Sequence, residues 1–289
     1  SFYNKINEQS AFAVSLRYFT LGEIELRQFA NDPGTIAKPN ELALDGSYSL
    51  KLSPTFSMAV GGRYIRSNLK LPQNGSENSE AAGSFAVDVA GYYRSREIAY
   101  NNFDGRWRGG FNLSNIGGKI QYDEGGQENF LPSKLSVGGG FDFILDQDNV
   151  IGITTEFTKL LVPTPQDFDG DGDVDAADND IYQNESGFSG IFNSFTDAPD
   201  GFGEELKEFT WALGAEYVYQ DAFMIRTGYF NESEEKGSRK FFTLGAGFKF
   251  KAAQVDLSYL FSTSQVRNPL ENTLRFSLTF NLGEEYYND

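Results

Sequence analysis

Hydrophobic and polar residues alternate along most of the chain, and the alternation is most regular near the C-terminal end. In the segments 242–250, 255–261 and 274–282, every second residue is apolar and most residues between them are polar or glycine. A period of two predicts β-strands with one apolar and one polar face. Runs of about ten residues are also long enough for a tilted strand to cross a bilayer.

The same alternation predicts thirteen strands in the whole chain. In the third strand, Leu44, Tyr48 and Leu50 face one way, and Asp45 and Ser47 face the other. The predicted strands lie at 10–19, 23–30, 41–52, 54–66, 83–94, 105–114, 131–145, 149–160, 206–219, 222–230, 239–250, 253–262 and 272–282.

The connections between these strands alternate in length. Short connections lie near 21–22, 53–54, 146–149, 220–221 and 251–252, whereas long ones lie at 31–40, 67–82, 115–130, 161–205, 231–238 and 263–271. The connection 95–104 is intermediate in length and falls in the short series. Outer-membrane barrels have short periplasmic turns and long extracellular loops. We therefore predict an all-β fold, a transmembrane outer-membrane β-barrel that forms one domain over 1–289, with a long extracellular loop at 161–205 and a periplasmic C-terminus.

The strand count adds an expectation about the N-terminal end. Bacterial single-chain barrels have an even number of strands, with both ends in the periplasm. Thirteen strands with a periplasmic C-terminus leave the N-terminus on the other side. We expect that at least one N-terminal strand is absent from this chain, that the whole barrel has about fourteen, and that the strand at 272–282 pairs with a strand upstream of residue 1.

Composition excludes several classes of function. The 289 residues include no cysteine and no histidine, which rules out disulfides, thiolate metal sites and Ser-His-Asp catalysis. A net charge of −17 argues against a nucleic-acid partner. A mean hydropathy of −0.42 leaves a soluble β-sandwich or propeller as the alternative fold. Because aromatic residues make up 15% of the chain and lie along the strands, the barrel is favoured.

Charged residues recur on the polar faces of the predicted strands. Charge inside a membrane protein is costly unless it is paired or wet, so we predict paired charges that fill or line a polar interior rather than a substrate-conducting path. The predicted interior positions are Arg17, Asp45, Arg63, Asp88, Arg94, Arg106, Arg108, Asp142, Glu216, Arg226, Asp256 and Arg275.

The longest connection, 161–205, contains an acidic motif. Its aspartates follow the spacing of an EF-hand calcium loop at positions 1, 3, 5 and 9, with Gly172 at position 6 and aspartate instead of glutamate at position 12. Carboxylates at alternate positions point inward when a chain turns around a hard cation. The predicted calcium-binding residues are Asp167, Asp169, Asp171, Asp173, Asp175 and Asp178.

Each position in this motif has an expected role. Asp173 would bind through its carbonyl oxygen, Asp175 through a water, and Asp178 from the first turn of a short helix at about 176–182. The pattern resembles the calcium loop of dockerins, which also ends in aspartate. The alternative is a solvated acidic loop without a fixed ion. We expect the ion to order the loop, not to take part in chemistry.

Several segments resemble the PorV (LptO) family of outer-membrane proteins, which belong to the type IX secretion system of Bacteroidetes. They include 15–22 (SLRYFTLG), 48–67 (YSLKLSPTFSMAVGGRYIRS), 226–233 (RTGYFNES) and 269–278 (PLENTLRFSL). The related PorQ and PorP types and a generic FadL-like barrel remain as alternatives. The resemblance covers barrel segments throughout the chain and carries no catalytic signature.

The resemblance implies a fourteen-stranded barrel of the FadL class in the outer membrane, with a non-enzymatic role. It implies three protein partners: the large type IX translocon barrel, secreted cargo proteins with C-terminal signal domains, and a sortase-like surface attachment complex. Outer-membrane lipid would surround the strands. The alternative function is that of a FadL-like channel for the uptake of hydrophobic small molecules.

Overall fold

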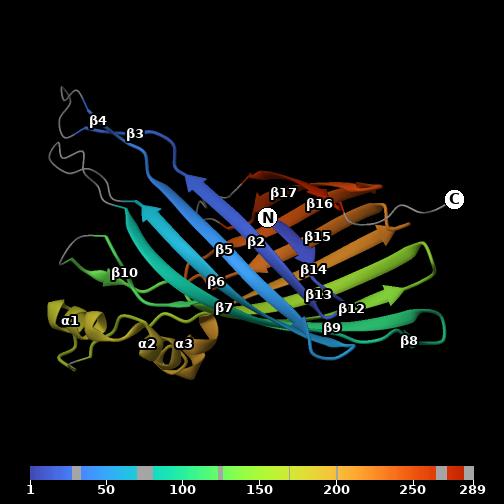
Figure 1. Cartoon of the computed structure of the whole chain (residues 1–289). Coiled ribbons are helices and arrows are strands. Elements are labelled where there is room, and N and C mark those ends of the chain that lie inside the picture. Colours follow the sequence, from blue (N-terminus) through green and yellow to red (C-terminus); the bar gives the residue numbers. More distant parts are fainter. Residues whose placement is uncertain are drawn as a thin grey trace. The chain divides into compact units, whose positions relative to one another are not determined.

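An antiparallel sheet of fourteen strands dominates the computed structural model (Figure 1). The structure describes residues 1–27, 34–69, 81–122, 126–168, 170–199, 201–264 and 272–282. In order of pairing, the strands are β1 (Phe2–Lys5), β2 (Ser10–Thr20), β5 (Asn40–Lys51), β6 (Phe56–Asn68), β7 (Ala82–Arg94), β9 (Asp104–Gly117), β12 (Lys134–Ile144), β13 (Asn149–Leu160), β14 (Phe209–Tyr219), β15 (Phe223–Asn231), β16 (Lys240–Phe250), β17 (Ala253–Ser262) and β18 (Leu274–Phe280), while β8 (Ile98–Ala99) pairs with β9.

Smaller elements lie in the long connections. Between β2 and β5, β3 (Ile24–Leu26) pairs with β4 (Thr35–Ala37). Between β9 and β12, β10 (Ile120–Gln121) pairs with β11 (Glu128–Asn129). The connection from β13 to β14 contains α1 (Ala176–Asn184), α2 (Gly187–Asn193) and α3 (Phe202–Lys207). Within the described ranges, no helix has the length and hydropathy needed to cross a membrane.

Tight turns set the register of the C-terminal hairpins. Phe250 pairs with Ala253 across a two-residue turn, and Lys251 in that turn has a φ of 51°. In the turn from β14 to β15, Gln220 and Asp221 have φ values of 52° and 50°. Turns with positive φ match the right-handed twist of hairpin strands. These turns correspond to the short connections predicted near 220–221 and 251–252.

The chain folds as two compact units. The first comprises 1–91, 112–135 and 160–202, and contains β1–β6, most of β7, the end of β9, β10, β11, α1 and α2. The second comprises 92–111, 136–159 and 203–289, and contains the described strands from β14 onward, nearly all of β12 and β13, and most of α3.

In each unit, one face of the strands exposes large apolar side chains. Phe85 of β7, in the first unit, is 72% exposed, whereas its neighbour Ala86 on the opposite face is only 3% exposed. In the second unit, Leu244 of β16 and Leu257 of β17 are exposed in the same way. An apolar exposed face with a polar opposite face is the pattern of strands that contact lipid.

The buried core of the first unit is small and lies on the polar side of its strands. Ala82 and Ala86 of β7 pack with Ile120 and Leu131, which belong to the connection between β9 and β12. That connection therefore folds back onto the strands. Its position creates the cavity described below.

The second predicted strand, 23–30, is wrong as a strand of the main sheet. Only Ile24–Leu26 is extended, and it pairs with β4 in a separate two-stranded sheet, while 28–30 lie outside the described residues. The short connection expected near 21–22 is therefore part of one long connection, 21–39. The sequence also gave no sign of β1, which pairs with β2 through Phe2 and Val14. The other twelve predicted strands correspond to strands of the main sheet.

Candidate functional site

A network of charges centred on Arg63 crosses the polar face of the first unit. Arg63 of β6 donates through Nε to Asp45, its direct register partner on β5, and through Nη2 to Asp88 of β7 at 2.9 Å. Its Nη1 donates to the side chain of Asn115. The Arg63 and Asp45 side chains are only 14% and 17% exposed. The network joins four strands and pairs both carboxylates with one guanidinium group.

Asn115 links this network to the connection that follows β9. Its φ is 60°, in the left-handed region that asparagine tolerates. Its backbone N–H donates to Asp88 at 2.8 Å, and its side-chain amide donates to the carbonyl of Pro132 at 3.0 Å. Asn115 thus fixes the end of β9 both to the charge network and to the connection between β9 and β12.

A cavity of about 660 Å³ lies beside this network, within the first unit. Its apolar lining includes Ile65, Phe130 and Leu131, and its polar lining includes Arg17 and Glu41. Arg17 makes no ion pair within the described residues, in contrast to Arg63. A largely apolar cavity of this size with a few polar groups is typical of a site for a small molecule.

Helices α1 and α2 cover the connection that lines the cavity. Lys119 donates to the carbonyl of Gln183 in α1 at 2.7 Å, and the rings of Phe130 and Tyr182 meet edge to face with their centroids 5.2 Å apart. A Cβ atom on Gly190 of α2 would lie 2.9 Å from the Phe130 ring, so only glycine permits this packing. Burial lowers the pKa of Lys119 and raises that of Tyr182.

The predicted calcium loop folds around its own carboxylates. Asp167 accepts hydrogen bonds from the backbone N–H groups of Gly170 at 2.6 Å and Gly172 at 2.8 Å. Gly172, at position 6, has a φ of 98°, a conformation that favours glycine. Asp171 accepts from the N–H of Asp173 at 2.9 Å. Asp169 lies outside the described residues.

The last ligand position closes the loop. Asp178 is 1% exposed and accepts from the N–H of Phe168 at 2.5 Å through Oδ1 and from that of Asp175 at 3.0 Å through Oδ2. Asp175 caps α1 by accepting from Ala177 at 2.7 Å. The helix expected at about 176–182 is present as α1. The described residues fit a calcium loop, because position 6 has the required turn and position 12 lies against the first turn of the loop.

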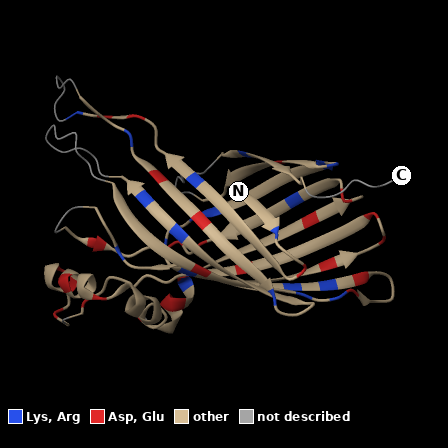
Figure 2. Ribbon diagram, in the orientation of Figure 1, with Lys and Arg blue, Asp and Glu red and all other residues tan. Residues whose placement is uncertain are grey.

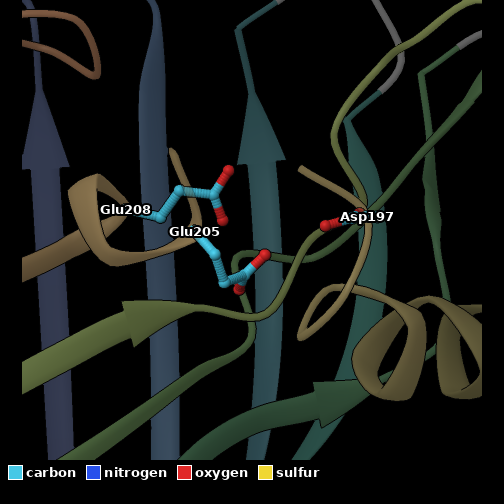
Figure 3. A group of neighbouring side chains, drawn as sticks. All are labelled: Asp197, Glu205 and Glu208. Carbon is cyan, nitrogen blue, oxygen red and sulfur yellow. The ribbon is translucent and has the colours of Figure 1, made fainter. Parts of the chain in front are cut away.

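A second ionic cluster lies in the second unit. Lys159 of β13 is fully buried and contacts the carboxylates of Glu205 in α3 and Glu208, whose side chains are drawn in Figure 3. Lys236, in the connection between β15 and β16, donates to Glu204 and, at 3.1 Å, to Glu208. The cluster fastens α3 to a strand end and to a neighbouring connection.

The ionisation of Glu208 is set by two opposing effects. Burial disfavours the charged carboxylate, but hydrogen bonds from Lys159 and Lys236 outweigh burial, and the pKa of Glu208 lies below its ordinary value. Asp197, also drawn in Figure 3, accepts from the backbone N–H of Thr164 at 2.7 Å in the first unit.

Most of the predicted interior charges are paired. Arg226 contacts Glu216 and Asp256, Arg108 contacts Asp142 at 2.8 Å, and Arg106 contacts Glu97. In the part of the chain that the structure describes, Arg17, Arg94 and Arg275 make no ion pair. The prediction of paired charges is confirmed for the other positions. Figure 2 shows acidic and basic residues distributed over the strands.

Comparison with protein families gives a clear assignment. The family model described as "Type IX secretion system protein PorV" matches residues 1–167, which is more than half of the chain. The chain belongs to the PorV family. It is therefore an outer-membrane component of the type IX secretion system, as the resemblance implied, and its fold is that of an outer-membrane β-barrel.

Comparison with solved structures finds porins of low similarity to this PorV-family chain. A triple mutant of the porin of Rhodopseudomonas blastica is 12% identical, with 94% of this chain and 91% of the porin covered and a TM-score of 0.32. Another mutant of that porin is 11% identical, with 89% and 86% covered and a TM-score of 0.30. Among curated proteins, none matches this chain.

Two features of this PorV-family chain were not predicted from the sequence. The ionic cluster around Lys159 joins residues far apart in the chain, and no spacing of glutamates indicated it. Helix α2 has two glycines in seven residues and no strong helical pattern. Its only sequence signal is Ser186, whose side chain accepts from the N–H of Ser189 at 3.1 Å and caps the helix.

Proposed function

We propose that this PorV-family protein binds secreted cargo proteins at the type IX translocon through their C-terminal signal domains and carries them to the sortase-like attachment complex at the cell surface. The observation that supports this proposal best is the structure of the β13–β14 connection. It forms three helices and packs through Gly190, Tyr182 and Gln183 on the connection beneath it. A packed helical surface of this kind suits a receptor for folded domains.

The alternation of connection lengths supports an extracellular position for this platform. The turns 52–55, 145–148 and 251–252 are short, whereas 118–133 and 161–208 are long. In outer-membrane barrels the long connections face outward. The helices would then lie on the side of the membrane where cargo is attached to the surface.

A non-enzymatic role is supported by the chemistry of the side chains. The chain has no histidine or cysteine to act as base or nucleophile. Beside the main cavity, Arg63 engages both Asp45 and Asp88. Such a network suits the structural support of a polar interior.

We also propose that calcium binds Asp167, Asp169, Asp171, Asp173, Asp175 and Asp178. In this arrangement the ion would neutralise part of the loop's charge and hold α1 in place. Support comes from the conformation of Gly172 and from the closure of the loop by Asp178. The proposed role of the ion is structural, namely to order the loop.

A second function, uptake of hydrophobic small molecules through a FadL-like channel, is favoured by the cavity of about 660 Å³ and its apolar lining. Organic extraction of the purified protein followed by mass spectrometry tests this function. A stoichiometric amphiphile that is lost in an Ile65→Trp variant, which fills the cavity, would support uptake. An empty cavity would argue against uptake and leave cargo binding as the remaining proposed function.

Purification of the protein from its own membrane tests the cargo function. We expect the translocon barrel and proteins bearing the C-terminal signal to co-purify with it. Co-purification of neither, under detergents that preserve other membrane complexes, would contradict the proposal.

A further inference from the structure

Helix α2 presents two large apolar rings to solvent. Phe188 and Phe192 are four residues apart on this helix, so their side chains lie on the same face. Phe188 is 62% exposed and Phe192 is 74% exposed. Adjacent exposed aromatic rings on a folded loop are uncommon away from binding surfaces.

The opposite face of α2 is fixed in place. Ile191 is 6% exposed, and a Cβ atom on Gly190 would lie 2.7 Å from Pro163 and 2.9 Å from Phe130. The buried side chain of Ser194 donates to the carbonyl of Ile191 at 2.9 Å. Because this inner face is packed without space, the helix cannot rotate to bury the two phenylalanines without losing these contacts.

The surroundings of the two rings are strongly acidic. The connection 161–205 contains nine aspartates, three glutamates and no lysine or arginine, so its formal charge is −12. A bound calcium ion would leave −10. In Figure 2, the ribbon of α1 carries red but no blue residues. A second copy of this chain would bring the same negative charge, and an anionic lipid surface would also be repelled.

We propose that Phe188 and Phe192 form the anchor of a protein-binding surface, and that the occupant is the signal domain of a secreted protein through a patch that is apolar at its centre and bordered by lysine and arginine. This inference rests on the proposed function. Aromatic anchors supply much of the binding energy of such surfaces, and complementary charge speeds association. The anchor surface is rigid before binding, which lowers the entropic cost of association.

Binding of a purified C-terminal signal domain from a secreted protein of the same organism to the full chain in detergent micelles tests this inference. The comparison uses the wild type, the double variant Phe188→Ser with Phe192→Ser, and a control. The control is Ile36→Ser in β4, which replaces an apolar side chain that is 59% exposed in a different long connection. Resistance of the folded barrel to SDS without heating verifies that each variant folds.

We expect the double variant to bind the signal domain at least about tenfold more weakly, the control to bind as the wild type does, and wild-type binding to weaken as salt rises. If the wild type binds and the double variant binds equally well, the anchor is wrong and the proposed function stands. If the wild type binds no signal domain, both the anchor and the proposed function are contradicted. If the double substitution changes only self-association, or only binding to lipid vesicles, the occupant is not a signal domain and the inference is overturned.

Discussion

The backbone N–H of Phe168 donates to Oδ1 of Asp178 at 2.5 Å, and this bond brings the two ends of the acidic loop together. Asp178 is buried, although it is a carboxylate in a segment with many others. Its two oxygens accept from Phe168 and Asp175, so the loop is closed by hydrogen bonds before any ion is considered. A loop closed in this way needs little reorganisation to bind a cation.

Replacing Asp178 is expected to abolish calcium binding. The Asp178→Asn variant loses the charge at position 12, and isothermal titration calorimetry should detect no heat of calcium binding to it. The wild type should bind with a dissociation constant of about 10⁻⁴ M or somewhat tighter. Asp180→Asn, an exposed change on the same helix outside the motif, serves as the control and should bind normally. A wild type that shows no binding at millimolar calcium would refute the site.

Calcium should also protect the connection between β9 and β12. Tyr182 and Gln183 of α1 hold Phe130 and Lys119 of that connection, and α1 begins at the calcium loop. We expect limited proteolysis within 118–133 to be several times faster when a chelator is added, because the loss of order in α1 would release these contacts.

The Tyr182→Ala variant should show that faster cleavage even with calcium present, while Ile181→Ala, at an exposed position of the same helix, should not. Equal cleavage rates of the wild type with and without calcium would show that calcium binding does not affect the connection between β9 and β12, and would disprove the predicted coupling.

Arg63 should be essential for the stability of the first unit. The Arg63→Met variant leaves Asp45 and Asp88 without their cation in a poorly exposed site. Breaking a buried ion pair by removing one partner costs about 3–5 kcal/mol. Urea unfolding in micelles should show a loss of free energy of unfolding of about this size. Arg17→Met, which removes an arginine that makes no ion pair among the described residues, should cost much less, and equal losses would argue against the network.

Acid should weaken the cluster around Lys159. The pKa of Glu208 is lowered in the folded protein, so its stabilising contribution is complete above its unfolded value of about 4.3 and is lost as the pH falls through the lower folded value. The midpoint temperature of thermal unfolding of the wild type should therefore decrease as the pH is lowered from 5 to about 3.

The Glu208→Gln variant should have a lower midpoint temperature than the wild type at neutral pH, and this temperature should depend less on pH. Glu235→Gln changes a more exposed partner of Lys207 and is the matched control. If Glu208→Gln and the control follow the same pH curve as the wild type, Glu208 does not contribute to acid sensitivity.

The sequence predicted the main strands because their alternation reflects a physical requirement, with one face against lipid and one against a polar interior. Asp45 and Arg63 were expected on the polar face and are direct partners. Ile24 and Leu26 show the same alternation, but they belong to a short hairpin with β4, and alternation alone does not reveal which strand will be the partner. The first turn of α1 was predicted because the last positions of the calcium motif, Asp175 and Asp178, also suit the cap and the first turn of a helix.

The rest of the candidate site depends on contacts between distant segments. Lys159 meets Glu205 and Glu208 only after the long connection has folded, and Phe130 meets Tyr182 for the same reason. Helix α2 is held by the packing of Gly190 against Pro163, not by intrinsic helix propensity. The exposure of Phe188 and Phe192 follows from that packing and was invisible in the sequence pattern.

The central claim, that this PorV-family protein carries cargo, is tested most directly by deleting its gene and measuring the proteins released from or attached to the cell surface. We predict that proteins with the C-terminal signal domain accumulate inside the cell with the domain uncleaved, and that the gene supplied in trans restores their secretion. Normal secretion and signal cleavage in the deletion strain would contradict the account.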